Sequence, residues 1–144
     1  MKSKETAVGG WLFKEEPDHF SFSDLERDGE TLWDGVDNNL ARKNLRLVQA
    51  GDQVLYYHTG KEKAIVGEML VVESATPDPS SEDPKAVVVK VRAVRSWSTP
   101  LTLARIKKDP ELSSWDLVRN SRLSVMAVTA AQWQRLLKLR DDDN

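Results

Sequence analysis

Apolar residues alternate with polar ones, or run together, in several short stretches that predict β-strands. The stretches lie at 11–13, 53–58, 64–74, 86–97 and 125–128. Pro77, Pro79 and Pro84 mark the connection between the third and fourth stretches as a loop, because proline disfavours the interior of a strand. The chain therefore has enough strand signals for one sheet or barrel.

Helix-start signals or apolar residues at helical spacing separate these strands. They predict a short helix from a Ser23–Glu26 capping box to Gly29, a helix from about Asn39 to Gly51, a short helix over 101–107 and a C-terminal helix capped by Thr129 and Gln132. Trp133, Leu136 and Leu137 form one apolar face of the last helix. Helices and strands mix without a regular βαβ repeat, which favours an α+β barrel over a doubly wound sheet.

The same pattern predicts a single domain over residues 10–139. Residues 1–9 are polar and without periodicity, so we expect a disordered lead. Residues 140–144 form an acidic tail that includes three consecutive aspartates. With 144 residues and 40% hydrophobic residues, the chain is long enough to build one core.

The composition excludes several classes of protein. There is no cysteine, which rules out a disulfide framework, a thiol nucleophile and a cysteine-ligated metal. The apolar runs are too short to span a bilayer, and the N-terminus lacks the apolar core of a signal peptide. We therefore expect a monomeric protein of the cytoplasm, or of the nucleus in a eukaryote, with no membrane partner and no cofactor or metal.

The chain has a net charge of −2, so it lacks the strong positive field of a non-specific nucleic-acid binder. Basic residues nevertheless gather in the last third of the chain: Arg105, Lys107, Lys108, Arg119, Arg122, Arg135, Lys138 and Arg140. Solvated side chains on two helices are the favoured interpretation of this group. A groove for phosphates is the alternative.

The segment Trp33–Asn39 concentrates the chemistry of a planar polar pocket. Its indole offers a face for stacking, Gly35 lets the backbone approach a ligand, and Asp34, Asn38 and Asn39 supply hydrogen-bonding groups. The alternative is an ordinary Asp-Gly turn beside a core tryptophan.

Catalytic signals are few. His19 and His58 are the only histidines, without metal-ligand spacing, and there is no phosphate loop. In an extended strand Lys14 faces one side of the sheet and Glu15 the other, so only Glu16 shares the lysine's side. An exposed ion pair is the simpler interpretation of Lys14 and Glu16. For His58, a hydrogen bond to the backbone and a contact to a ligand are equally favoured.

Four ordered segments together resemble the EVE domain family. They are Trp11–Pro17, Trp33–Asn39, Gly51–Gly60 and Arg122–Val125. The resemblance implies a PUA-like fold, a compact mixed β-barrel with short flanking helices, related to the YTH and ASCH domains. Members of that superfamily mostly bind RNA or modified nucleobases.

The chain departs from the common family pattern at three positions. Glu15 replaces a serine of the first motif, and Asp37 and Asn39 replace an arginine and a tyrosine of the second. These changes make the neighbourhood more acidic or less aromatic. Some related ASCH domains are amidohydrolases that use a lysine, a threonine and a glutamate, but the first motif here has Lys14 and Glu16 without a threonine.

We therefore expect a non-catalytic module that binds a modified base of DNA or RNA, or the corresponding nucleoside. The base flips out of the strand, stacks on Trp33 and forms hydrogen bonds with its surroundings. The residues expected to bind it are Lys14, Glu15, Glu16, Trp33, Asp34, Gly35, Val36, Asn38, Asn39, Tyr57, His58, Arg122, Leu123 and Ser124. The alternatives are a small amidohydrolase acting on a modified pyrimidine nucleoside and a pocket for a free metabolite.

Overall fold

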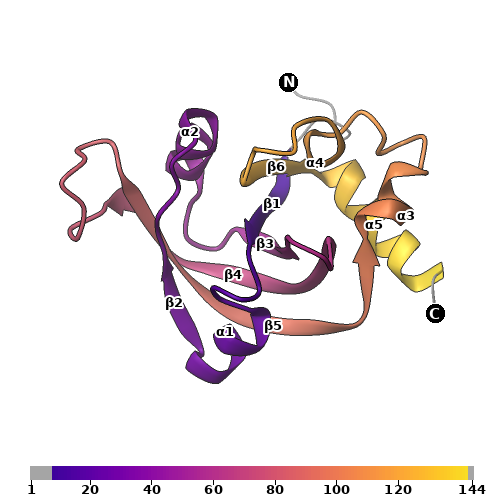
Figure 1. Ribbon diagram of the computed structural model, residues 1–144, viewed down its shortest axis with the longest axis horizontal. Helices are drawn as coiled ribbons and strands as arrows, with labels where there is room; N and C mark the ends of the chain where they lie inside the picture. The colour runs from indigo at the N-terminus through magenta and orange to yellow at the C-terminus, as the bar shows by residue number, and fades with distance from the viewer. Residues whose placement is uncertain (1–7, 143–144) are drawn as a thin grey trace.

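The computed structural model describes residues 8–142 as one sheet with helices packed on it (Figure 1). The strands are β1 (Val8–Glu15), β2 (Glu30–Trp33), β3 (Gln53–His58), β4 (Ala64–Pro77), β5 (Val87–Thr102) and β6 (Val125–Thr129). The helices are α1 (Phe22–Asp28), α2 (Asn39–Leu47), α3 (Leu103–Lys107), α4 (Asp116–Arg119) and α5 (Ala130–Asp142). None of the helices in this part of the chain is long and apolar enough to cross a membrane.

The six strands form a mixed sheet in the order β2-β5-β4-β3-β1-β6. β1 and β3 are parallel, and the other neighbouring pairs are antiparallel. The edge strands β2 and β6 do not pair with each other, so the expectation of a closed barrel is wrong, whereas the α+β class is confirmed. Helix α2 follows the edge strand β2 and packs against β4, β5 and β6, so a helix covers the side that strands leave open.

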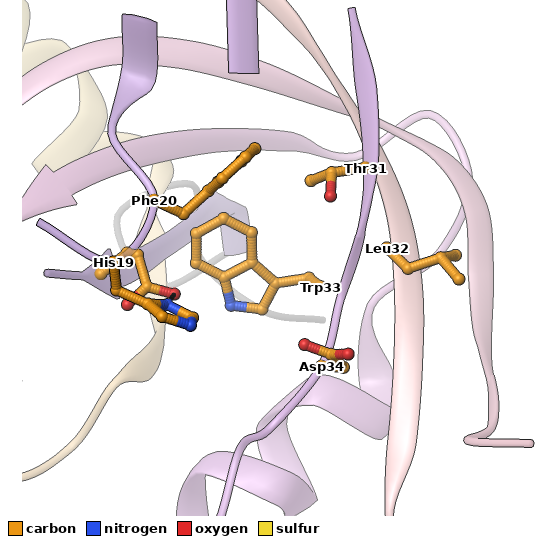
Figure 2. Close-up of a pocket in the computed structure, with 7 residues that line it drawn as sticks. His19, Phe20, Thr31, Leu32, Trp33 and Asp34 are labelled. Atoms are coloured by element: carbon orange, nitrogen blue, oxygen red, sulfur yellow. Dashed lines mark ion pairs between the residues drawn. The ribbon is translucent and has the colours of Figure 1, made fainter. Parts of the chain in front are cut away.

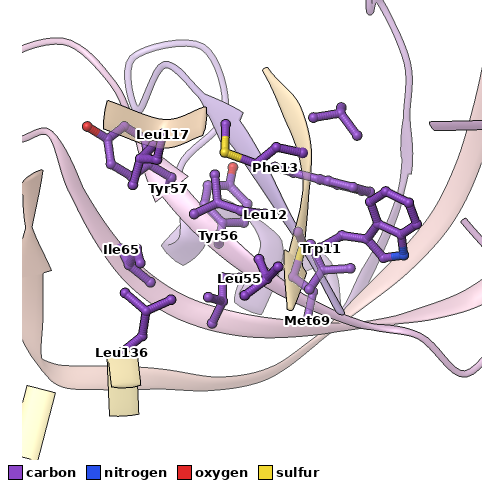
Figure 3. Packing of buried hydrophobic residues seen from close by; sticks show 14 of the residues in the cluster. Trp11, Leu12, Phe13, Leu55, Tyr56, Tyr57, Ile65, Met69, Leu117 and Leu136 are labelled. Carbon is purple, nitrogen blue, oxygen red and sulfur yellow. The ribbon is translucent and has the colours of Figure 1, made fainter. Parts of the chain in front are cut away.

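Apolar side chains fill both faces of the sheet (Figure 3). On one face Gly67 leaves room for Phe22 of α1, since a Cβ at this position would lie 2.5 Å from the phenyl ring. On the other face Gly10 leaves room for Trp133 of α5, because a Cβ there would lie 2.6 Å from both the indole and the Gln53 carbonyl oxygen. One glycine on each face thus lets an aromatic residue of a helix reach the sheet.

Several sequence-based boundaries need correction. β1 begins at Val8, which pairs with Thr129, so Val8 and Gly9 are not part of a disordered lead, and residues 1–7 lie outside the described chain. The capping box of α1 joins Ser21 to Asp24 and not Ser23 to Glu26. The acidic tail begins inside α5, which continues to Asp142.

Other elements differ in length or were not expected. Helix α2 ends at Leu47, before Gly51, and α3 starts at Leu103 because β5 continues to Thr102. The short elements β2 and α4 had no sequence prediction. The remaining strands and helices lie where hydrophobic periodicity places them, with ends shifted by a few residues.

Candidate functional site

A small cavity opens between the end of β1, the turn that follows it and β2 (Figure 2). Its volume is about 230 Å³, and it is lined by Glu15, His19, Phe20, Thr31, Leu32, Trp33 and Asp34. Glu15, Trp33 and Asp34 belong to the residues that the sequence predicts for ligand binding. Pockets for drug-sized ligands measure about 300 to 1,000 Å³, so this cavity suits a single planar ring better than a larger molecule.

Trp33 forms a wall of the cavity from within the hydrophobic core. It is only 5% exposed, and its ring packs against Phe13 at 5.3 Å and Tyr56 at 5.4 Å between centroids. The expectation of an open indole face for stacking therefore does not fit this packing. Figure 2 shows the indole pointing from β2 toward Phe20 and His19.

The indole N–H of Trp33 has no hydrogen-bond partner among residues 8–142, unlike those of three other tryptophans. Trp11 donates to Asp52 at 2.9 Å, Trp97 to Glu68 at 2.8 Å and Trp115 to the Ala127 carbonyl oxygen at 3.2 Å. Every fully buried side-chain nitrogen or oxygen in this part of the chain has a partner, so the N–H of Trp33 is accessible to solvent. Trp33 therefore contributes an unused donor next to the cavity.

Two carboxylates supply acceptors at the same cavity. Glu15 is held in place, because its Oε1 accepts a hydrogen bond from the Glu16 amide at 2.8 Å and its Oε2 lies 3.2 Å from Nδ1 of His19. Asp34 follows β2, is exposed and has no side-chain partner within the described part of the chain. The cavity thus combines one free donor with carboxylate acceptors on an aromatic wall.

Residues behind the cavity hold the Phe20 wall against the sheet. The Tyr56 hydroxyl donates to the Phe20 carbonyl oxygen, and burial, together with the nearby Glu15 and Asp24 carboxylates, raises the pKa of Tyr56. Nε2 of His58 accepts the Phe22 amide at 3.0 Å, while its Nδ1 lies 2.7 Å from Glu62. His58 is therefore hydrogen-bonded to the backbone, as one of the two interpretations proposed, and it does not line the cavity.

The segment after Trp33 is mainly a structural loop that leads into α2. The side-chain oxygen of Asn38 accepts the Ala41 amide at 2.9 Å and caps the helix, so it is already used. Gly35 has a φ of 69°, a conformation that favours glycine. Val36 offers its carbonyl oxygen to Arg42 at 2.6 Å, and Asn39 is the exposed first residue of α2. None of these four predicted residues, 35, 36, 38 and 39, lines the cavity.

Arg42 fixes this loop through several contacts. Besides the Val36 carbonyl oxygen, its guanidinium lies 2.9 Å from Asp83, in the connection between β4 and β5, and 3.8 Å from Asp37. Its side chain is only 13% exposed, so it acts inside the structure and not as a free surface charge.

A second group of predicted residues lies on the opposite side of β1. Nζ of Lys14 donates to the Ser121 carbonyl oxygen at 3.1 Å and lies 5.8 Å from the centre of the Tyr57 ring. Burial lowers the pKa of Lys14 and raises that of Tyr57 to about 12. The Ser124 carbonyl oxygen accepts the Lys14 amide at 2.9 Å. Lys14 therefore faces away from the Glu15 cavity.

The remaining predicted residues surround this second group. Leu123 is fully buried, Arg122 is exposed, and Glu16 is exposed beside Gly60 without an ion pair to Lys14. The predicted site is therefore split between two sides of one strand. Within residues 8–142 no cluster of three His, Asp or Glu side chains could hold a metal ion.

Sequence patterns did not single out His19, Phe20, Thr31 and Leu32 as cavity residues. Thr31 and Leu32 belong to β2, which had no prediction, and their alternation with Trp33 was the one available signal. His19 and Phe20 reach the cavity because the chain turns back after β1, with the Phe20 and His19 amides both donating to the Glu16 carbonyl oxygen.

Comparison with known proteins agrees with this architecture. The family model of the EVE domain matches residues 10–139. Thymocyte nuclear protein 1 of Homo sapiens is 30% identical over 167 residues, covering 92% of this chain and 74% of the relative. The solved structure of Rpa0253 from Rhodopseudomonas palustris has a TM-score of 0.87 at 35% identity and covers 95% of this chain and 96% of its own.

A further similar structure contains a ligand. The crystal structure of the human THYN1 protein in complex with 5-methylcytosine-containing DNA has a TM-score of 0.84 at 31% identity, covering 92% of this chain and 97% of that chain. The family match over most of the chain, supported by these relatives, is specific. The chain therefore belongs to the EVE domain family.

Proposed function

We propose that this protein is a non-catalytic module that binds a modified nucleobase, flipped out of a nucleic-acid strand, in the cavity beside Trp33. The observation that carries the proposal is the unused indole N–H of Trp33 beside the carboxylates of Glu15 and Asp34, in a space of about 230 Å³. The human THYN1 protein, which is similar over most of this chain, was solved with 5-methylcytosine-containing DNA. A methylated cytosine is accordingly the first ligand to test.

The groups around the cavity match the edge of such a base. A carboxylate accepts a hydrogen bond from the exocyclic amine of cytosine, and an indole N–H can donate to a ring nitrogen or carbonyl oxygen. Hydrogen bonds to charged groups contribute about 1.5 to 3 kcal/mol each, which is comparable to the few kcal/mol that flipping a base costs. Half-buried Phe20 supplies the aromatic face that the buried Trp33 does not.

The amidohydrolase alternative is not favoured by this geometry. It needs a lysine beside the ligand, whereas Lys14 lies on the other side of β1 and donates to Ser121.

We also propose that the protein is a monomer of the cytoplasm or nucleus. Light scattering of the purified protein tests the first part, and localisation of a tagged copy tests the second.

Binding of DNA with one 5-methylcytosine, compared with the unmodified sequence, tests the proposal. Glu15→Gln and Asp34→Asn keep the shape of each side chain but remove the negative charge and replace one acceptor oxygen by an amide nitrogen. We expect each to weaken binding of the modified DNA about tenfold or more. Asp37→Asn is the matched control, because Asp37 is 95% exposed in the same loop and does not line the cavity.

Two outcomes would contradict the proposal. Equal affinity of the wild type for modified and unmodified DNA would remove base recognition. Equal effects of Asp34→Asn and Asp37→Asn would mean that the cavity is not the binding site. If the free modified nucleoside bound as tightly as the DNA, and if the affinity for the DNA did not depend on salt concentration, the metabolite alternative would be favoured instead.

A further inference from the structure

A second depression, of about 400 Å³, lies between the β3–β4 turn and α3. Its lining residues are Lys61, Glu62, Lys63, Thr102, Leu103, Ala104 and Lys107. The three lysines are exposed, and none has a carboxylate partner among the residues that the structure describes. Glu62, the one acid in the lining, is hydrogen-bonded to His58 at 2.7 Å. The depression is therefore positively charged in a protein of net charge −2.

The backbone holds this turn in a defined shape. Lys63 has a φ of 47° and is the one residue other than glycine with a positive φ between residues 8 and 142. A lysine adopts this conformation at a cost, so the surrounding structure must impose it. The Lys63 carbonyl oxygen accepts the Leu103 amide at 2.7 Å, which fixes the turn to the start of α3. Lys107 of α3 therefore faces the same depression as the two lysines of the turn.

Backbone contacts place the turn next to the Trp33 cavity. The Thr59 amide donates to the carbonyl oxygen of Glu15, a cavity residue, at 3.0 Å. Gly60 packs against the Glu16 carboxylate, where a Cβ would lie 3.3 Å from Oε2. Lys61 follows two residues after Thr59, so their Cα atoms are at most about 7.6 Å apart. The β3–β4 turn therefore begins beside the backbone of a cavity residue, Glu15.

A nucleic-acid strand needs a basic surface for its phosphates outside the cavity, because the cavity itself is acidic. Glu15 and Asp34 line the cavity, and their carboxylates repel phosphates there. Many other cations are neutralised by carboxylates: Arg27, Arg42, Lys90, Arg95, Arg135 and Arg140 each form an ion pair. The lysines of the depression are among those that remain available for phosphate.

We propose that Lys61, Lys63 and Lys107 bind backbone phosphates of the nucleic-acid strand whose base enters the Trp33 cavity. This inference rests on the proposed function and adds a separate surface for the strand. It also explains how an acidic cavity can serve a polyanion, since base and phosphates contact different parts of the protein.

The test compares two double variants that remove the same charge. Lys61→Gln with Lys107→Gln changes the depression but leaves Lys63 and its backbone conformation intact. Lys43→Gln with Lys85→Gln removes two exposed lysines of α2 and of the β4–β5 connection. Affinity for DNA with one 5-methylcytosine is measured over a series of salt concentrations, and the free modified nucleoside is measured in parallel. Thermal unfolding of both double variants checks that they are folded.

We expect the depression variant to bind DNA on the order of tenfold more weakly at low salt. The slope of log K against log salt should become shallower by about 0.9 for each phosphate that the variant no longer neutralises. The control pair should change both quantities much less. Lys61→Arg with Lys107→Arg keeps the charge and should retain affinity. The nucleoside carries no phosphate, so its affinity should stay the same in every variant.

Equal decreases of affinity in the depression and control variants would overturn the inference, because overall charge alone would explain them. An unchanged salt slope in the depression variant would also overturn it, while leaving base binding intact. If the wild type bound neither the modified DNA nor the nucleoside, the proposed function itself would fail. The two failures are therefore distinguishable.

Discussion

The two sides of β1 use the same short motif for different purposes. On one side Glu15 joins Trp33 and Asp34 at a cavity with acceptors and a free donor. On the other side Lys14 is half-buried, contacts Tyr57 and donates to the Ser121 backbone. Neighbours in a sequence motif therefore need not share a site, because successive side chains of a strand point to opposite faces.

The largest expected effect is on the free energy of unfolding and concerns Trp33, the cavity wall that packs in the core. Trp33→Ala should reduce the free energy of unfolding by about 3 to 5 kcal/mol, because it removes a buried aromatic residue. Arg122→Ala, on the exposed part of the other side, should change it by at most about 0.5 kcal/mol. Denaturant unfolding measures both. Equal stability of Trp33→Ala and the wild type would show that Trp33 is not a core residue.

A smaller effect is expected for Lys14. Lys14→Met keeps a long apolar side chain and removes the hydrogen bond to Ser121, so it should cost about 0.5 to 1.5 kcal/mol. Binding of a modified nucleoside should be unchanged, in contrast to Glu15→Gln, and calorimetry measures both affinities. If Lys14→Met weakened nucleoside binding as much as Glu15→Gln, the two sides would form one site.

The smallest effect concerns Tyr57, which lies beside Lys14. Burial raises its pKa from 10.0 to about 12 in the folded protein. The unfolded chain ionises first, so this contribution to stability is complete below pH 10 and is lost as the pH rises toward 12. Tyr57→Phe should therefore weaken the alkaline decline of the melting temperature over that interval. An identical decline in the variant and the wild type would contradict this assignment.

Local patterns predicted most of the fold, and long-range pairing explains the gaps. Alternation located five strands, but β2 has four residues and depends on pairing with β5, from Glu30 opposite Arg92 to Trp33 opposite Val89. The capping box was misplaced because Ser21 with Asp24 and Ser23 with Glu26 have the same spacing, and only the folded chain selects the first.

The candidate site was predicted in part for a similar reason. The motif identified Trp33, Asp34 and Glu15, which are close in space. It could not reveal that Asn38 caps a helix in this structure or that Phe20 is held by Tyr56, since these roles depend on contacts between separate segments. The direction of Lys14, however, follows from strand alternation alone.

The indole N–H signals of the five tryptophans give the most direct test of the cavity as the binding site. In an NMR titration with DNA that carries 5-methylcytosine, the signal of Trp33, assigned with Trp33→Phe, should shift strongly because its N–H gains a partner. The signal of Trp115, already bonded to Ala127, should stay nearly constant. A stationary Trp33 signal while the DNA binds to saturation would contradict the proposed site.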